Sequence, residues 1–458
     1  MSTDPVGAGP RAVSAPAVAD EDPRRRTDRW FRWGLLAIVA VAVAIRLVYA
    51  LGTVADDPVS GDSYYYHHAA RLLADGEGMI FPYDLYELGE RNEAADHPPL
   101  YVLYLAGWSL VGLDSVEAHL VASVLLGGAA VALSGLVGRR VAGPVVGLVA
   151  AGLVALYPNL ITWDSVLLSE PTGTVTTLLV LLAAYRHLEL RTTATAALLG
   201  GSIGLATLAR PELVLLSLFV AVPAVLGTSH LDRRQRAAQL VLAGTAAVAL
   251  LAPWVGWNLT RFDEPVVLST NLGVTLAYTN CDAVYDGPLL GYWEFGCGAY
   301  VAGNTEGYGA MDQSERSEVL QEFALEQIDE NRGELPKVAL ARAGRVLGVY
   351  DPAGHVDLEV AVERRNRTLA TLGMGAWYAV ALVGLAGFVV LGRARMVRYP
   401  LAAPLLTVVL ASVATYGTSR FRASAEPVVC VLAGVALVQL VHVVRQRRAR
   451  PAPGPQAT

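Results

Sequence analysis

Charge is scarce in this sequence, and lysine is almost absent from it. Only 17% of the 458 residues are charged and 54% are hydrophobic, whereas a soluble domain has about 25% charged and about 45–50% apolar residues. Lys337 is the single lysine, so arginine supplies nearly all of the positive charge. This composition excludes an ordinary soluble domain, and the arginine-rich usage is typical of a GC-rich bacterial genome.

Several functional motifs are also missing. The sequence has no His-Glu-x-x-His motif, no phosphate-binding loop and no Gly-rich dinucleotide fingerprint, which argues against proteases and ATP-driven pumps. It has no basic stripe of the kind that indicates nucleic-acid binding. His67 and His68 have no third ligand at metal spacing, so a zinc site is not expected there.

Long apolar runs make up most of the chain, and short arginine clusters separate them. A membrane-spanning helix needs roughly 20 mostly apolar residues. Ten runs qualify, at about 34–52, 117–137, 143–158, 166–185, 193–209, 212–228, 237–257, 372–392, 400–417 and 427–444. The predicted fold is therefore an all-α polytopic membrane protein with about ten transmembrane helices.

The arginine clusters predict which side of the membrane each loop occupies, because short cytoplasmic loops collect Lys and Arg. A ten-span chain puts every cluster on one side: the N-terminal arginines, Arg139–Arg140, Arg186 with Arg191, Arg233–Arg236, Arg393–Arg398 and Arg445–Arg450. Counting 98–113 as an eleventh span would break this pattern, so we expect that segment to lie on the outer surface or to re-enter. Both termini are then cytoplasmic, in a bacterial inner membrane.

This topology divides the chain into three regions. Residues 1–29 are expected to be a disordered cytoplasmic N-terminus, because the first stretch is rich in Pro, Ala, Gly and Ser. Residues 30–444 form the transmembrane domain, and 445–458 form a cytoplasmic tail. Two large loops, 53–116 and 258–371, face outward.

The second outer loop is expected to contain helices and a disulfide. Apolar residues recur at helical spacing over Ser314–Ile328 and Pro336–Val349. Cys281 and Cys297 both fall in this loop, and two cysteines in an oxidising compartment suggest a disulfide. Two unpaired small residues are the alternative.

Polar residues gather in the outer loops and turns, where they mark function because polar groups close to membrane depth are costly unless they face a cavity. In chain order the conspicuous passages are Gly61-Asp62-Ser63-Tyr64-Tyr65-Tyr66-His67-His68, His97-Pro98-Pro99-Leu100-Tyr101, Tyr157-Pro158, Leu168-Ser169-Glu170-Pro171, Ala209-Arg210-Pro211-Glu212, Pro253-Trp254 with Asn258, Arg420-Phe421-Arg422 and Ala425-Glu426-Pro427. Their order and shared placement resemble the GT-C superfamily of lipid-linked glycosyltransferases, over about residues 33–440. The branch of protein O-mannosyltransferases and lipid A aminoarabinose transferases is the most similar.

The resemblance implies transfer of a sugar from a polyprenyl-phosphate donor, with an acid of the first outer loop as general base. Asp62 matches the position of that acid. Removing the proton of a poorly nucleophilic hydroxyl typically contributes 10²–10⁴-fold. Two alternatives stay open: Asp62 caps a helix that begins at Ser63, or Asp56 or Asp57 is the functional acid.

The leaving phosphate needs cations, and arginine binds phosphate through bidentate hydrogen bonds. We assign the clamp to Arg420 and Arg422, with Arg210 as a further candidate. Interfacial anchoring, or pairing with Glu212 and Glu426, is the alternative. The full set of candidate substrate-binding residues is His97, Glu170, Arg210, Arg420, Arg422 and Glu426.

His97 and Glu170 are two further candidates for the site. His97 stands where the aminoarabinose branch has a lysine that reaches the donor phosphate, and histidine is only partly charged near pH 7. Glu170, at the outer start of its span, is expected to orient the partners of Asp62 or to contact the acceptor, or else to pair with an arginine.

The sugar and the acceptor are open: a hexosyl or pentosyl group could pass to a glycan, a lipid or a protein. A single base opposite the phosphate implies inversion at the anomeric carbon, by analogy with two-sided displacement. Nothing in the sequence requires a metal cofactor, although neighbouring acids could recruit Mg²⁺. The rival function is a non-catalytic carrier or flippase, or a scaffold for envelope assembly, but transporters place polar residues near the midplane and show inverted repeats.

Overall fold

The computed structural model describes residues 23–55, 57–227 and 231–449, and this part of the chain is almost entirely helical. Within it, the one β-type pairing is an isolated bridge between Ile80 and Glu93. The prediction of an all-α protein is confirmed. Most of the predicted N-terminal segment 1–29 and part of the predicted tail 445–458 lie outside the described residues.

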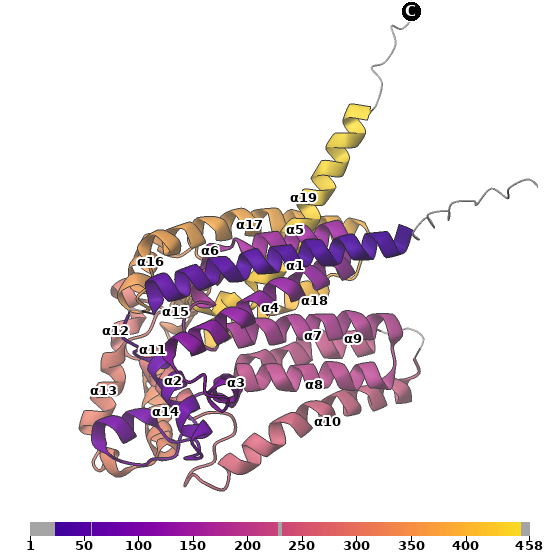
Figure 1. Cartoon of the computed structure of the whole chain (residues 1–458). Coiled ribbons are helices and arrows are strands. Elements are labelled where there is room, and N and C mark those ends of the chain that lie inside the picture. The colour runs from indigo at the N-terminus through magenta and orange to yellow at the C-terminus, as the bar shows by residue number, and fades with distance from the viewer. Residues whose placement is uncertain (1–22, 56, 228–230, 450–458) are drawn as a thin grey trace, which may run out of the picture.

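Within the part of the chain that the structure describes, nine helices with apolar sequences form the body of the molecule (Figure 1). They are α1 (Pro23–Tyr49), α4 (Val116–Ala142), α5 (Pro144–Ala155), α7 (Glu170–Leu190), α8 (Thr193–Ala209), α10 (Arg233–Asn258), α17 (Arg367–Arg393), α18 (Tyr399–Ala414) and α19 (Glu426–Ala449). Helix α10 packs against α8, α8 against α7, and α7 against α4. Helix α4 also packs against α5, α5 against α19, and α19 against α17. The ten expected spans fall on these helices and on a broken helical segment over residues 211–226.

Among residues 23–55, 57–227 and 231–449, five helical segments are long and apolar enough to cross a membrane: Asp28–Val54, Val116–Ala142, Arg233–Asn258, Arg367–Arg393 and Glu426–Ala449. Shorter apolar helices fill the space between them. The disputed segment 98–113 contains α3 (Pro99–Ser109), whose 11 residues rise only about 16 Å at 1.5 Å per residue. That is about half of the hydrocarbon thickness of roughly 30 Å, as expected for a segment that does not span.

Small residues allow the helices to pack closely. A Cβ atom at Gly200 of α8 would lie 1.9 Å from the carbonyl oxygen of Ala243 in α10, and one at Gly387 of α17 would lie 1.9 Å from the carbonyl oxygen of Leu432 in α19. Membrane helices associate through such contacts because lipid provides no hydrophobic driving force between them.

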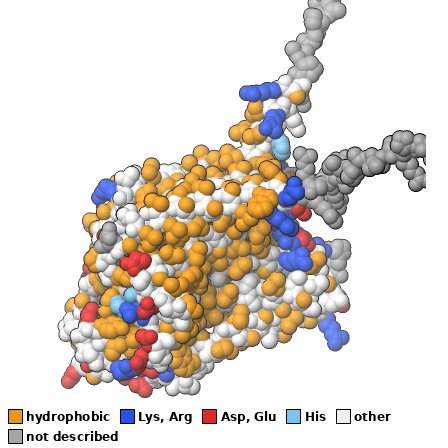
Figure 2. All heavy atoms as spheres, in the orientation of Figure 1, with side chains coloured by type: hydrophobic (Ala, Val, Ile, Leu, Met, Phe, Trp, Pro, Cys, Tyr) orange, Lys and Arg blue, Asp and Glu red, His pale blue; other side chains and the backbone are white. Residues whose placement is uncertain are grey.

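Charged side chains gather at the two ends of the bundle, and orange hydrophobic side chains cover the middle (Figure 2). At the end where α1 begins, Arg139 pairs with Asp28, and Arg140 Nε donates to Glu189 Oε1 at 2.9 Å. Several of the arginine clusters used for the topology prediction therefore come together, while their cytoplasmic location stays a prediction.

The opposite end of the bundle is built from short helices of the two large loops (Figure 1). They are α2 (Asp62–Ala74), α11 (Asn271–Thr279), α12 (Asp282–Tyr285), α13 (Phe295–Asn304), α14 (Gln313–Glu330), α15 (Leu335–Val346) and α16 (Pro352–Ala361). Helices α14 and α15 confirm the two helices predicted in the second loop. Cys281 and Cys297 form a disulfide there, as the sequence suggested.

Candidate active site

Asp62 begins α2 at the polar end of the bundle. Gly61 precedes it with a φ of +55°, in the left-handed region that glycine adopts without strain. Asp62 Oδ2 accepts a hydrogen bond from Arg420 Nη2 at 2.6 Å, and Asp62 Oδ1 lies 3.5 Å from His97 Nε2. Gly61, and not Asp62, occupies the N-cap position, so the alternative that Asp62 caps a helix beginning at Ser63 is wrong.

Arg420 lies between three carboxylates. It belongs to the short 3-10 turn η7 (Arg420–Ser424), just before α19. Its Nη2 contacts Asp62, its Nε donates to Glu170 Oε1 at 2.5 Å, and its Nη1 lies 3.7 Å from Glu363 Oε2. A planar guanidinium suits this arrangement because its five N–H donors point outward in fixed directions.

The charges of these neighbours keep Asp62 ionised. Burial by itself would raise the pKa of Asp62, but Arg420 and His97 outweigh burial and hold that pKa well below its usual range. His97 responds in the opposite sense. Burial would lower its pKa, yet the charges of Asp96 and Asp62 raise it above the usual value, which favours the imidazolium.

His97 is held from several sides. Its Nε2 lies 3.3 Å from Asp96 Oδ2, and the side-chain amide of Asn271 in α11 lies 3.1 Å from its Nδ1. Its ring stacks on Tyr66 with ring centroids 4.9 Å apart. The two outer loops therefore meet at His97, which stands directly beside Asp62.

Glu170, the first residue of α7, joins Arg420 to Arg210. Arg210 Nη1 donates to Glu170 Oε1 at 2.7 Å, and Arg210 Nε donates to Glu212 Oε1 at 2.6 Å. Glu170 thus pairs with arginines and at the same time orients Arg420, the partner of Asp62. Gly173 makes room for this pair, since a Cβ there would lie 2.6 Å from Arg210 Cδ.

Arg422 and Glu426 form a separate buried pair. Arg422 is 1% exposed and Glu426 is fully buried, with Arg422 Nε 3.1 Å from Glu426 Oε1. Asn159 Nδ2 donates to both oxygens of Glu426, at 2.8 and 2.9 Å. Arg422 Nη1 also donates to the carbonyl of Val346. The structure does not bring these two side chains to the cavity that Arg420 lines.

That cavity has a volume of about 1940 Å³ and opens beside the Asp62–Arg420 contact. Pockets for one drug-sized ligand occupy about 300–1,000 Å³, so the space is sufficient for two substrates. Asp62, His97, Arg210 and Arg420 line it, and so does Asp57. Asp56, the other rival acid, lies outside the described residues.

The cavity residues that were not predicted as site residues include the charged run Glu363, Arg364 and Arg365, between α16 and α17. Arg364 is exposed and has no ion-pair partner among residues 23–55, 57–227 and 231–449. Arg365 is buried against Glu359 and over the ring of Trp163. The available signal was a Glu-Arg-Arg run directly before an apolar span.

The described residues contain no group of three or more His, Cys, Asp or Glu side chains placed to hold a metal ion. The sequence set no requirement for a metal cofactor, and Mg²⁺ stays open.

Comparison with known proteins places this arrangement in a known fold. Residues 96–257 match the family model "Dolichyl-phosphate-mannose-protein mannosyltransferase". No curated protein sequence matches the chain. The predicted resemblance to GT-C polyprenyl-phosphate-dependent glycosyltransferases is confirmed by the family match and by the fold shared with solved structures.

Two of those structures are of an oligosaccharyltransferase from Archaeoglobus fulgidus. The enzyme AglB, in complex with an inhibitory peptide and a dolichol-phosphate, is 17% identical with a TM-score of 0.53, covering 94% of this chain and 53% of that one. A form tethered with an acceptor peptide is 16% identical with a TM-score of 0.50, covering 92% and 51%. The chain therefore spans about half the length of these enzymes. ArnT from Cupriavidus metallidurans bound to undecaprenyl phosphate is 17% identical, covering 92% and 81%, with a TM-score of 0.41.

Proposed function

We propose that this chain transfers a hexosyl or pentosyl group from a polyprenyl-phosphate donor to an acceptor hydroxyl at the outer face of a bacterial inner membrane. The observation that carries the proposal is the Asp62–Arg420 contact on the wall of a cavity large enough for two substrates. A match to a mannosyltransferase family over residues 96–257 supports the reaction class. The dolichol-phosphate in complex with the archaeal enzyme supports a lipid-phosphate donor.

The donor phosphate would bind to the cations of the cavity wall. Arg364 has no ion-pair partner among the described residues, and Arg420 Nη1 has only the long contact to Glu363. Both guanidinium groups can donate to phosphate oxygens. His97, with its raised pKa, adds a donor on the other side of Asp62.

Arg210 and Glu170 would then act as positioning residues for Arg420. We assign Arg422 and Glu426 a similar role, because their buried pair fixes the η7 turn that carries Arg420. A phosphate contact by Arg422 would require it to leave Glu426, which would strand a buried carboxylate at a cost of several kcal/mol.

Asp62 would act as the general base on the acceptor hydroxyl. Its carboxylate is 32% exposed to the cavity, and its lowered pKa keeps it ionised and able to accept a hydrogen bond. Attack on the face opposite the phosphate would invert the anomeric carbon. The second outer loop, which lines the other walls of the cavity, is the proposed acceptor-binding surface.

The test is a transfer assay with the full-length protein in lipid nanodiscs and a panel of radiolabelled polyprenyl-phosphate sugars. Wild type should consume one donor, and Asp62→Asn should lose roughly 10²–10⁴-fold in rate while it still binds that donor. Glu189→Gln, an exposed glutamate that pairs with Arg140 at the opposite end of the bundle, is the matched control and should match wild type. Donor binding without turnover by wild type, across glycan, lipid and protein acceptors, would favour the carrier function instead.

A further inference from the structure

Glu363 is a second carboxylate on the wall of the cavity, in the short segment between α16 and α17. Its side chain is 12% exposed, and its ion-pair contact is the 3.7 Å approach to Arg420 Nη1. Asp62 contacts Nη2 of the same guanidinium at 2.6 Å. The two carboxylates therefore lie on neighbouring nitrogens of one arginine and open into the same space.

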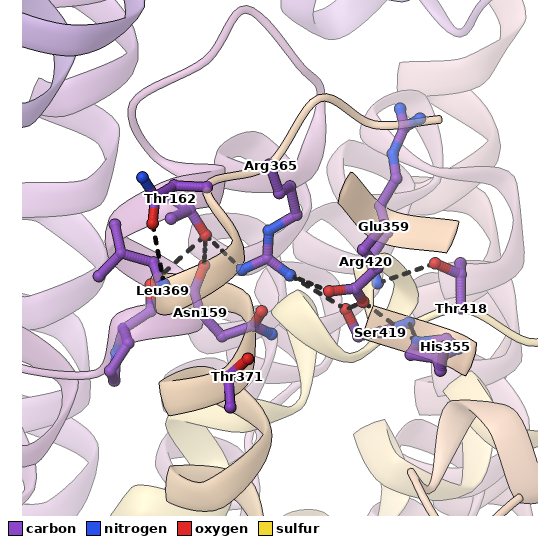
Figure 3. A network of polar contacts seen from close by, with 12 residues as sticks. Asn159, Thr162, His355, Glu359, Arg365, Leu369, Thr371, Thr418, Ser419 and Arg420 are labelled. Atoms are coloured by element: carbon purple, nitrogen blue, oxygen red, sulfur yellow. Dashed lines mark hydrogen bonds and ion pairs between the residues drawn. The ribbon is translucent and has the colours of Figure 1, made fainter. Parts of the chain in front are cut away.

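The segment that carries Glu363 is held rigidly from behind. Arg365 Nη2 donates to Thr162 Oγ1 at 2.6 Å, and Arg365 Nη1 donates to Glu359 Oε2 at 2.5 Å. Glu359 also contacts Ser419, and Ser419 directly precedes Arg420 (Figure 3). In Figure 3 the side chain of Arg420 leads away from this network. The same buried network thus fixes the backbone on both sides of the Glu363–Arg420 contact.

Charged and titratable groups surround Glu363 on every element packed around it: Arg420 on η7, Asp62 on α2, Glu170 on α7, Glu359 on α16, Tyr292 in the second loop and Tyr416 before η7. Burial raises the pKa of Glu363 to about 7; Arg420 opposes this rise, and the neighbouring carboxylates add to it. The pKa of Asp62 is lowered instead, because Arg420 and His97 are both close to it.

Because of these differences, Asp62 and Glu363 are suited to different steps of the proton transfer. Asp62 is placed to draw the proton from an acceptor hydroxyl, but an anion so strongly paired holds a proton poorly. Proton transfer is most efficient when the pKa of the accepting group is near the operating pH. Glu363, with its raised pKa and its place on the cavity wall, meets this condition.

We infer that Glu363 is the residue that holds the acceptor's proton after transfer, and that it receives this proton from Asp62 through water in the cavity that both carboxylates line. The inference rests on the proposed glycosyl transfer and adds a second carboxylate to its mechanism.

The step balances. The acceptor O–H bond breaks and its oxygen forms a bond to the anomeric carbon, while the bond from that carbon to the phosphate oxygen breaks and its electron pair stays on the phosphate. The proton passes through Asp62 to Glu363, so one carboxylate becomes neutral as the phosphate gains one negative charge. Repulsion between that new charge and a nearby carboxylate further favours the protonated form of Glu363.

The experiment is a pH–rate profile of single-turnover transfer by the full-length protein in nanodiscs. In wild type the rate should rise with pH through an apparent pKa near 7, because Glu363 must start ionised. Glu363→Gln should lose this rise and be roughly 10²-fold slower above it, the lower end of the range for a positioned proton acceptor. Glu363→Asp should restore a rise, and Glu189→Gln, at the opposite end of the bundle, should keep the wild-type profile.

A second measurement does not depend on turnover. Infrared difference spectra of the same nanodiscs, titrated from acid to alkaline pH, should show a protonated carboxyl band that disappears near pH 7 in wild type and is absent in Glu363→Gln. A wild-type profile in Glu363→Gln, or an unchanged band, overturns the inference while the proposed transfer stands. Absence of transfer by wild type with every donor and acceptor defeats the proposed function itself, and the infrared titration then still reports on Glu363.

Discussion

Arg420 and Asp62 are separated by 358 positions in the sequence, yet Arg420 Nη2 and Asp62 Oδ2 lie 2.6 Å apart. One residue precedes the last helix and the other begins the first helix of the first outer loop. Their contact closes the bundle at its polar end. It also determines the charge state of Asp62, because Arg420 is the main charge that offsets burial.

The first prediction concerns the shape of the guanidinium. Arg420→Lys keeps a positive charge but cannot contact Glu170, Asp62 and Glu363 at once, since an ammonium is a compact point charge. We expect transfer to fall by roughly 10²-fold or more, the loss typical of removing one preorganised charge-stabilising group. The apparent pKa of Asp62 should rise, which a pH–rate profile of the residual activity would detect. Wild-type activity in Arg420→Lys would show that a positive charge at this position is sufficient for transfer and that the planar guanidinium is not needed.

The second prediction uses the close approach at Gly173. Gly173→Ala puts a methyl group 2.6 Å from Arg210 Cδ, so Arg210 must shift away from Glu170. We expect a higher KM for the donor and a lower kcat. The matched control is Gly375→Ala in α17, where a Cβ meets nothing within 4 Å. Its kinetics should match wild type because no side chain has to move, and alanine is also the better helix former by about 1 kcal/mol. If Gly173→Ala and Gly375→Ala had the same kinetics, Arg210 would have no role in donor binding or transfer.

The third prediction tests the role of the buried pair. Glu426→Gln leaves the Arg422 charge without its counter-ion, and breaking a buried pair typically costs about 3–5 kcal/mol. We expect a large drop in the thermal unfolding temperature in detergent, together with a weaker donor affinity because the η7 turn that carries Arg420 loses its support. A loss of donor affinity at unchanged stability would instead assign Arg422 and Glu426 to substrate binding, as the sequence first indicated.

The fourth prediction concerns the disulfide. Cys281 and Cys297 are 16 positions apart, and closing a loop of that length is worth about 3 kcal/mol in the chain-entropy model. Alkylation of the unreduced, denatured protein followed by mass spectrometry should label Cys430 alone. Cys281→Ser should lower the unfolding temperature and make the second outer loop easier to cleave with protease. Labelling of all three cysteines would contradict the bond.

The fifth prediction is a pH dependence of stability. The pKa of Glu363 is raised to about 7 in the folded protein, above the value of about 4.3 for an unperturbed glutamate. The folded state therefore binds the proton more tightly, and stability falls as pH rises between those two values. Glu363→Gln removes this term, so the variant should gain unfolding temperature relative to wild type at pH 8 and little at pH 4. Parallel curves for the two proteins would mean that Glu363 titrates normally.

Much of the fold could be predicted because its signals are local. Apolar runs, arginine clusters and helical spacing each depend on residues that are close in sequence. They predicted the apolar bundle and helices over Ser314–Ile328 and Pro336–Val349, which the structure has at Gln313–Glu330 and Leu335–Val346. The Glu-Arg-Arg run at 363–365 is visible in the sequence, but its role in the site could not be predicted, because that role depends on Arg420 and Thr162 in distant parts of the chain.

By itself, the sequence determined that the protein is a helical membrane bundle, since hydropathy and charge act on each segment separately. It also determined that a motif with two arginines, Arg420 and Arg422, stands before the last helix. Only the tertiary structure decided that these two side chains lie in different surroundings. In a 3-10 turn of three residues per turn, residues two apart leave the backbone in different directions, so Arg420 reaches the cavity while Arg422 is buried against Glu426.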